Sequence, residues 1–165
     1  DRPVSGLVVF AKTSKALSRM TLKIKEREFK KIYLAIVKNK PPHEAGELSD
    51  YMIKNETQNK SYIVSSNTKG AKLAQLRYRL IGASDSYYLL EVELITGRHH
   101  QIRAQLAHMG CPIKGDLKYG FPRSNPDASI SLHAYKLQFE HPTTKNIICI
   151  KAPKPTGMPW DGFDL

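Results

Sequence analysis

Apolar and polar residues alternate along much of this chain, and a period of two is typical of β-strands rather than helices. The alternating segments are residues 31–37, 75–80, 90–94, 132–139 and 147–151. Turn sequences at residues 82–86 and 141–142 join two pairs of these segments into hairpins. Because a hairpin pairs its strands antiparallel, the sequence predicts a mostly antiparallel sheet. Within residues 31–37, we expect Tyr33 to lie on the opposite face of the sheet from Ile32.

Two segments have helical spacing instead. The first is capped by Thr13 or Ser14 and is predicted to run to about Glu28. The second is predicted to open at Thr96 and Gly97 and to end near Met109, before Gly110. The expected inner faces consist of Leu17, Met20 and Ile24 in the first helix, and of Ile102, Leu106 and Met109 in the second.

Two other stretches show neither the alternation of a strand nor the spacing of a helix. Residues 6–11 form a continuous apolar run and are predicted to be a buried strand. Residues 39–68 contain Pro41, Pro42 and Gly46 and are predicted to be a long irregular connection, with one short strand near residues 62–64. No linker divides the chain. We therefore expect one α+β domain over residues 1–165, with a mostly antiparallel mixed β-sheet and interspersed helices.

The balance of charged residues narrows the class of molecule that the chain is expected to bind. The chain has 26 Lys and Arg against 15 Asp and Glu, a formal charge of +11. An excess of this size attracts polyanions, so nucleic acid is the leading partner, although a solvated basic surface would have the same composition. No apolar run approaches the roughly 20 residues that cross a bilayer. Cys111 and Cys149 are the only cysteines, which favours a reducing cytoplasm over a disulfide framework.

The sequence lacks the motifs of several common classes of phosphate-binding and metal-binding proteins. The phosphate-binding patterns GxxxxGK[ST] and GxGxxG are absent, and so are the metal patterns HExxH and paired CxxC. His99 and His100 are adjacent, so on a helix their rings would point in different directions, whereas a metal pair needs a spacing of three or four. We expect RNA contact or packing for these histidines, with no metal and no cofactor.

Five ordered motifs carry a more specific signal and together span nearly the whole chain. They lie at residues 1–12, 31–37, 96–103, 110–120 and 132–142. The first three match HRLDxxTSGLxxxAK from its aspartate onward, KxYxAxV and TGRxHQIR; the last two resemble GHPIxGDxxYG and LHAxxLxFxHP. In these motifs the chain resembles the RluA-type pseudouridine synthases, enzymes that isomerise uridine in RNA. The resemblance implies the pseudouridine synthase fold and an enzyme that needs neither redox chemistry nor ATP.

The resemblance also assigns the site residues. Asp1 matches the catalytic aspartate, Tyr33 the tyrosine that lies against the uracil, and Arg103 the basic partner of the aspartate. An aspartate beside a guanidinium stays ionised, which suits a nucleophile or a stabiliser of positive charge at C1′. The sequence leaves the covalent route and the route through sugar deprotonation both open.

The target uridine must leave its stack to reach such a pocket, so basic residues are expected to hold the flanking phosphates. The candidates are Arg98, His99 and His100 beside the predicted second helix, and a stripe at every fourth position of the first helix, Lys15, Arg19, Lys23 and Arg27. A solvated helix face would show the same spacing. Ribosomal RNA and transfer RNA are both plausible substrates, and we expect a monomer that needs no protein partner and does not enter a membrane.

The match has two departures from the family pattern. First, the His-Arg-Leu that precedes the family's aspartate is absent, so the catalytic domain is expected to lack its N-terminal portion. Second, Val4 stands where the family pattern has a threonine. The main alternative is a non-catalytic RNA-binding domain that retains the fold, which explains the charge but not the three matched site residues. A uracil glycosylase is a third class, but no water-activating site for one is apparent.

Overall fold

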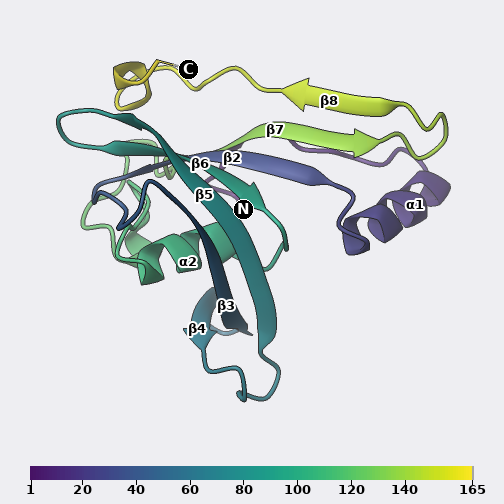
Figure 1. Ribbon diagram of the computed structural model, residues 1–165, viewed down its shortest axis with the longest axis horizontal. Coiled ribbons are helices and arrows are strands. Elements are labelled where there is room, and N and C mark those ends of the chain that lie inside the picture. Colours follow the sequence, from purple (N-terminus) through teal and green to yellow (C-terminus); the bar gives the residue numbers. More distant parts are fainter. Residues whose placement is uncertain (165) are drawn as a thin grey trace.

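The computed structural model describes residues 1–164 and is built on one eight-stranded sheet (Figure 1). The strand order is β1-β7-β2-β6-β5-β3-β4, and β8 pairs with β7. All pairs are antiparallel except β1 with β7. The strands are β1 (Ser5–Gly6), β2 (Lys30–Val37), β3 (Ala45–Asn55), β4 (Lys60–Val64), β5 (Lys72–Ala83), β6 (Tyr88–Leu94), β7 (Leu132–Glu140) and β8 (Ile147–Lys151); the helices are α1 (Ser14–Lys25) and α2 (Gln101–His108). The predicted α+β class is confirmed.

Strand β2 lies at the centre of the sheet and is buried on both faces. Ala35 and Val37 pack against α2 together with Tyr33, whereas Leu34 and Ile36 pack against the C-terminal segment that carries Trp160 and Phe163. Leu34 to Val37 are 0% exposed. The prediction that Tyr33 and Ile32 lie on opposite faces is confirmed, because side chains alternate along a strand.

The predicted irregular connection over residues 39–68 is wrong. Strand β3 runs through it for 11 residues and pairs with β5 on one side and β4 on the other. Figure 1 shows β4 and the adjoining ends of β3 and β5 projecting together away from the rest of the sheet. Only Met52 of β3 is fully buried, so the strand has little apolar alternation and depends on backbone pairing with distant segments.

The predicted buried strand over residues 6–11 is also wrong. The strand is limited to Ser5 and Gly6, and Val8 and Phe10 are 70% and 84% exposed. β1 and β8 share one edge of β7, because β2 occupies the other. Since β8 pairs from Lys136 onward, the segment after Gly6 finds no free edge of β7 along which to continue.

The first helix is confirmed in its cap but not in its inner face. The Thr13 hydroxyl accepts a hydrogen bond from the backbone of Ala16, as expected of an N-cap. The helix ends at Lys25 rather than Glu28, and of the three predicted inner residues only Met20 is buried; Leu17 and Ile24 are exposed.

The second helix begins at Gln101, four to five residues later than predicted. His100 has a left-handed backbone with φ of 53°, which interrupts the helix. The Gln101 side chain accepts hydrogen bonds from the Thr96 hydroxyl at 2.8 Å and the Arg98 backbone at 2.9 Å. Residues 96–100 are therefore a turn. The expected inner face is confirmed, with Ile102 and Leu106 buried and Met109 partly buried.

Candidate active site

A cavity of about 480 Å³ lies where the chain start, β2 and the turn before α2 meet. Asp1, Tyr33 and Arg103 all line it, as do Arg98 and Lys31. The structure thus brings together three residues that are separated by up to 102 positions in the chain. Their convergence depends on β2 and α2 packing against each other through the same core.

Arg103 is the most firmly held side chain of the site. Its Nε and Nη2 donate to the two carboxylate oxygens of Asp116 at 2.7 and 2.8 Å, a bidentate pair in which both residues are at least 95% buried. The guanidinium also lies over the ring of Tyr119, 5.1 Å from its centroid. These contacts leave Nη1 directed toward Asp1 and His100.

Asp1 is held at the mouth of the cavity with its side chain 22% exposed. One carboxylate oxygen accepts from Arg103 Nη1 at 3.4 Å, and the other lies 3.1 Å from His100 Nε2. Its backbone carbonyl accepts from the N–H of Val4, which closes a tight turn. Arg103 favours the ionised form of the carboxylate.

His100 is buried and joins Arg103 to Tyr119. His100 Nε2 lies 3.1 Å from Arg103 Nη1 and 3.1 Å from a carboxylate oxygen of Asp1, and its Nδ1 lies 3.0 Å from the Tyr119 hydroxyl. Nε2 accepts when Arg103 donates to it and donates when the Asp1 carboxylate accepts from it, so the ring links the acid, the guanidinium and the phenol. Burial and the Arg103 charge lower the pKa of His100 to about 3, which agrees with a neutral ring.

This burial predicts a loss of stability in acid. Because the folded pKa of about 3 lies below the ordinary histidine value of 6.5, the unfolded chain takes up the proton first as pH falls, so stability is lost between pH 6.5 and 3. The attraction of the Asp116 carboxylate acts in the opposite direction, and we expect a loss of about 1–2 kcal/mol between pH 7 and 5. Urea unfolding at the two pH values measures it.

The two matched variants for this measurement lie eight positions apart, at the N-cap and at the last residue of α2. His100→Asn should remove that part of the pH dependence, whereas His108→Asn, at an exposed position of α2, should retain it. An unchanged pH dependence in His100→Asn would show that another group is responsible.

His99 connects the site to the β3–β4 hairpin. Its Nδ1 lies 2.8 Å from the Ser61 hydroxyl, and its Nε2 lies 3.0 Å from the side-chain oxygen of Asn59. The His99 and His100 rings stack with centroids 3.8 Å apart. The expectation that the two rings point in different directions is wrong, because they lie in a turn and not on a helix.

Tyr33 lines the cavity from β2 and is half-buried. Burial raises the pKa of its phenol, so the hydroxyl stays protonated at neutral pH. In residues 1–164, no group of three or more His, Cys, Asp or Glu side chains is arranged to hold a metal ion. The chemistry visible in the cavity is that of a carboxylate, an aromatic ring and cationic groups.

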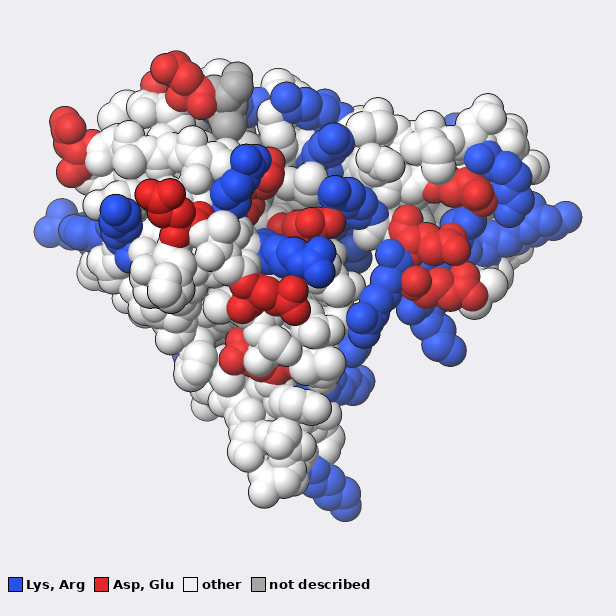
Figure 2. All heavy atoms as spheres, in the orientation of Figure 1, with Lys and Arg blue, Asp and Glu red and all other residues white. Residues whose placement is uncertain are grey.

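The predicted RNA-contacting residues divide into two groups. Arg98, His99 and His100 line the cavity, and Arg98 Nε donates to the Leu73 carbonyl at 2.9 Å. The α1 residues do not line it. Figure 2 shows acidic side chains interspersed with basic ones around α1.

Ion pairs and the position of the helix end interrupt the stripe of basic residues that was predicted along α1. Lys23 pairs with Glu28 at 2.7 Å and Glu140 at 2.9 Å, and Arg19 donates to the Pro142 carbonyl. Arg27 lies beyond the end of α1, so the predicted regular stripe is not present as such. Lys15 remains exposed, and RNA contact at all four positions stays a prediction.

Three residues of the site were not assigned a role from the sequence: Asp116, Tyr119 and Lys31. Asp116 and Tyr119 lie in the motif at residues 110–120, so this motif could have identified them as site residues. Lys31 begins the motif that contains Tyr33. Their contribution follows from contacts across the fold, which no single motif specifies.

No helix among residues 1–164 has both the length and the apolar character needed to span a bilayer. Fold and cavity together define an α+β domain in which a carboxylate, an aromatic ring and cationic groups share one cavity. Residues 1–108 match the RNA pseudouridylate synthase family. The chain belongs to this family, and the resemblance to its RluA-type members is confirmed.

The relatives cover almost the whole chain. An uncharacterized RNA pseudouridine synthase of Chloroflexus aurantiacus is 36% identical over 159 residues, which are 96% of this chain and 49% of that protein. The ribosomal large subunit pseudouridine synthase C of Buchnera aphidicola is 33% identical over 162 residues, 93% of this chain and 51% of that protein. The chain thus spans about half the length of these relatives.

A solved structure supports the fold. The human RNA pseudouridylate synthase domain containing 1 is similar with a TM-score of 0.70 and 24% identity, over 88% of this chain and 62% of that one. At this identity the likeness concerns the arrangement of strands and helices.

Proposed function

We propose that this chain carries the catalytic site of an RNA pseudouridine synthase, with Asp1, Tyr33 and Arg103 as its catalytic residues. The observation that supports this most directly is the shared cavity, in which the Asp1 carboxylate lies 3.4 Å from Arg103 Nη1 and Tyr33 lines the same space. Family membership supplies the reaction type. The predicted single catalytic domain over residues 1–165, lacking its N-terminal portion, stays a prediction.

The reaction breaks the bond between N1 of uracil and C1′ of the ribose, turns the base, and joins C5 to C1′; C5 loses a proton and N1 ends with one. Asp1 would act at the sugar, either by forming an ester at C1′ or by stabilising positive charge there and assisting proton removal. Arg103 would keep the carboxylate ionised and in place. Both routes remain compatible with the site.

Tyr33 would hold the detached uracil by stacking. Because burial raises the pKa of its phenol, the ring enters the reaction protonated. We therefore assign it stacking and hydrogen-bond donation rather than service as a general base. A base that stacks on the ring stays close to C1′ while it turns.

RNA is the proposed substrate, and ribosomal or transfer RNA uridines are its candidate targets. The formal charge of +11 supports a polyanionic partner. One relative is named as a synthase of the ribosomal large subunit, which favours ribosomal RNA. The target uridine would be flipped out of its stack into the cavity. A cytoplasmic location, a monomeric state and the absence of a cofactor stay predictions.

The experiment that tests this function is pseudouridine mapping on RNA treated with the full-length protein. Ribosomal and transfer RNA transcripts are incubated with the protein, derivatised with carbodiimide and read by primer extension. We expect a new stop at one or a few uridines. RNA that is bound but never modified would contradict the proposal and favour the alternative, a non-catalytic RNA-binding domain that retains the fold.

A further inference from the structure

Lys31 is a cationic residue inside the cavity that the mechanism leaves unused. It lies on β2 two positions before Tyr33, and both residues line the same cavity. Its side chain is half-buried, and burial lowers the pKa of its ammonium group. A charge in such a position costs free energy unless an opposite charge compensates it.

No carboxylate within residues 1–164 provides that compensation. Lys31 takes part in none of the ion pairs of the described chain, and desolvation is the sole influence on its pKa. The adjacent Lys30 points to the other face of the sheet and pairs with Glu93 at 3.6 Å. Of two consecutive lysines, the exposed one therefore has an acidic partner, and the half-buried one has none in the part of the chain that the structure describes.

The ammonium group of Lys31 lies against the turn before α2. A Cβ atom on Gly97 would lie 3.3 Å from Lys31 Nζ, so the amine reaches the turn before α2, next to Arg98. Arg98 lines the same cavity. A cavity that is lined by two cationic side chains, Lys31 and Arg98, suits an anion.

We propose that Lys31 binds a phosphate group of the RNA backbone next to the target uridine. The inference rests on the proposed function, because the cavity must receive a nucleotide. Uracil is neutral and cannot compensate the ammonium charge, whereas RNA brings one phosphate charge for each nucleotide. The absence of a side chain at Gly97 lets the Lys31 amine lie against the turn, and the phosphate would approach the amine from the cavity.

Salt-dependent RNA binding tests the assignment. The affinity of full-length wild type, Lys31→Met and Lys31→Arg for a substrate RNA is measured between 50 and 200 mM salt. Losing one phosphate contact should lower the slope of log K against log salt by roughly 0.7–1. We expect this reduction in Lys31→Met, together with an approximately ten-fold weaker binding at low salt, and near-normal values in Lys31→Arg.

Lys30→Met is the matched control, since it removes the same charge from the neighbouring residue on the opposite face. It should leave the slope within about 0.2 of wild type, because Lys30 lies outside the cavity. Thermal unfolding of each variant verifies that the fold is intact.

Two results would overturn the phosphate assignment. One is a Lys31→Met slope equal to that of wild type while wild-type protein modifies RNA; this rejects the inference and leaves the proposed function standing. The other is lost turnover with an unchanged slope, which would place Lys31 on the uracil instead. Wild-type protein that binds no RNA would reject the proposed function and the inference together.

Discussion

Replacing Asp1 by Asn should reduce pseudouridine formation by at least about a thousand-fold while RNA affinity changes by less than about three-fold. Asparagine has nearly the size of aspartate and can still accept a hydrogen bond from Arg103 Nη1, now 3.4 Å from Asp1. Its amide is neutral, so it neither attacks C1′ nor stabilises positive charge there. Single-turnover kinetics on a mapped uridine separates the loss of chemistry from any loss of binding.

Asp85→Asn is the matched control for this experiment. Asp85 is exposed in the hairpin between β5 and β6 and does not line the cavity. The same chemical change there should leave the rate unaltered. Modification that continues undiminished in Asp1→Asn, with the Asp85 variant unchanged, would show that another residue carries the reaction.

Replacing Asp116 by Asn should destabilise the protein by about 3–5 kcal/mol. Asp116 is 1% exposed and its two oxygens bind Arg103 Nε and Nη2 at 2.7 and 2.8 Å. The amide offers one acceptor where the carboxylate offered two, and it leaves the buried guanidinium without a neutralising charge. Denaturant unfolding at neutral pH gives the change in unfolding free energy. Activity should fall as well, since Arg103 would no longer be fixed beside Asp1.

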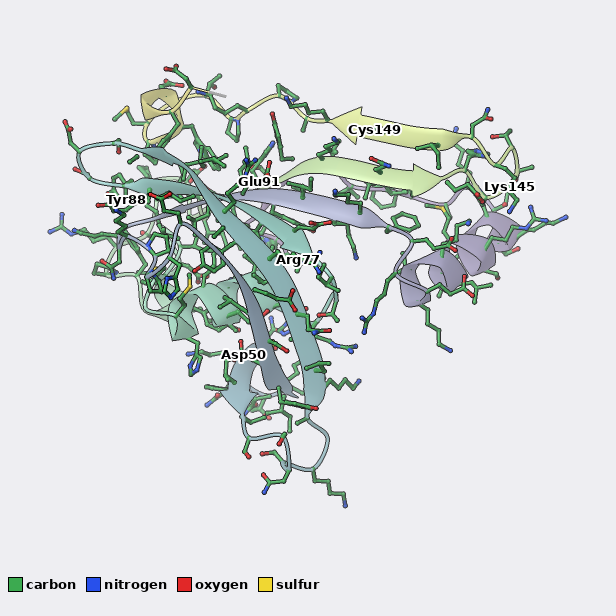
Figure 3. The ribbon with its side chains drawn as sticks, viewed as in Figure 1. Asp50, Arg77, Tyr88, Glu91, Lys145 and Cys149 are labelled. Carbon is green, nitrogen blue, oxygen red and sulfur yellow. The ribbon has the colours of Figure 1, made fainter. Side chains whose placement is uncertain are left out.

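Glu91→Gln is the control, because it removes an acid from an arginine pair at the surface. Glu91 lies on β6, where Figure 3 labels it, and pairs with Arg79 at 3.1 Å; the two side chains are 31% and 64% exposed. Solvent screens this pair, so the loss should be below about 1 kcal/mol. Equal losses in the Asp116 and Glu91 variants would contradict the buried-pair interpretation.

Local sequence patterns predicted the strands whose side chains alternate between two faces. The two faces pack on separate cores, or one packs on a core and the other faces solvent. In β2 the alternation of Tyr33 with its neighbours is visible in the sequence because each face packs on its own core. The cap at Thr13 was predictable for a similar reason, since a side chain satisfying a nearby backbone group needs only local sequence.

The structure of segments that depend on distant partners could not be predicted from local sequence patterns. Strand β3 pairs with β5 and β4 through backbone groups, which carry no side-chain signal. Figure 3 labels Asp50 on β3; its carboxylate accepts from Gln105 of α2 at 2.7 Å, a contact that links elements 55 residues apart. The apolar run after Gly6 suggested a strand, but strand formation also requires a free sheet edge.

The sequence alone determined the mostly antiparallel sheet and the family, and it predicted Asp1, Tyr33 and Arg103 as site residues, because these follow from periodicity and from motifs whose residues are close in the chain. Only the tertiary structure decided that Asp116 neutralises Arg103, that His100 is a buried neutral ring, and that Lys31 has no acidic partner among residues 1–164. Those properties depend on burial and on which charges meet in space. Both are fixed when strands and helices pack, and the order of residues does not display them.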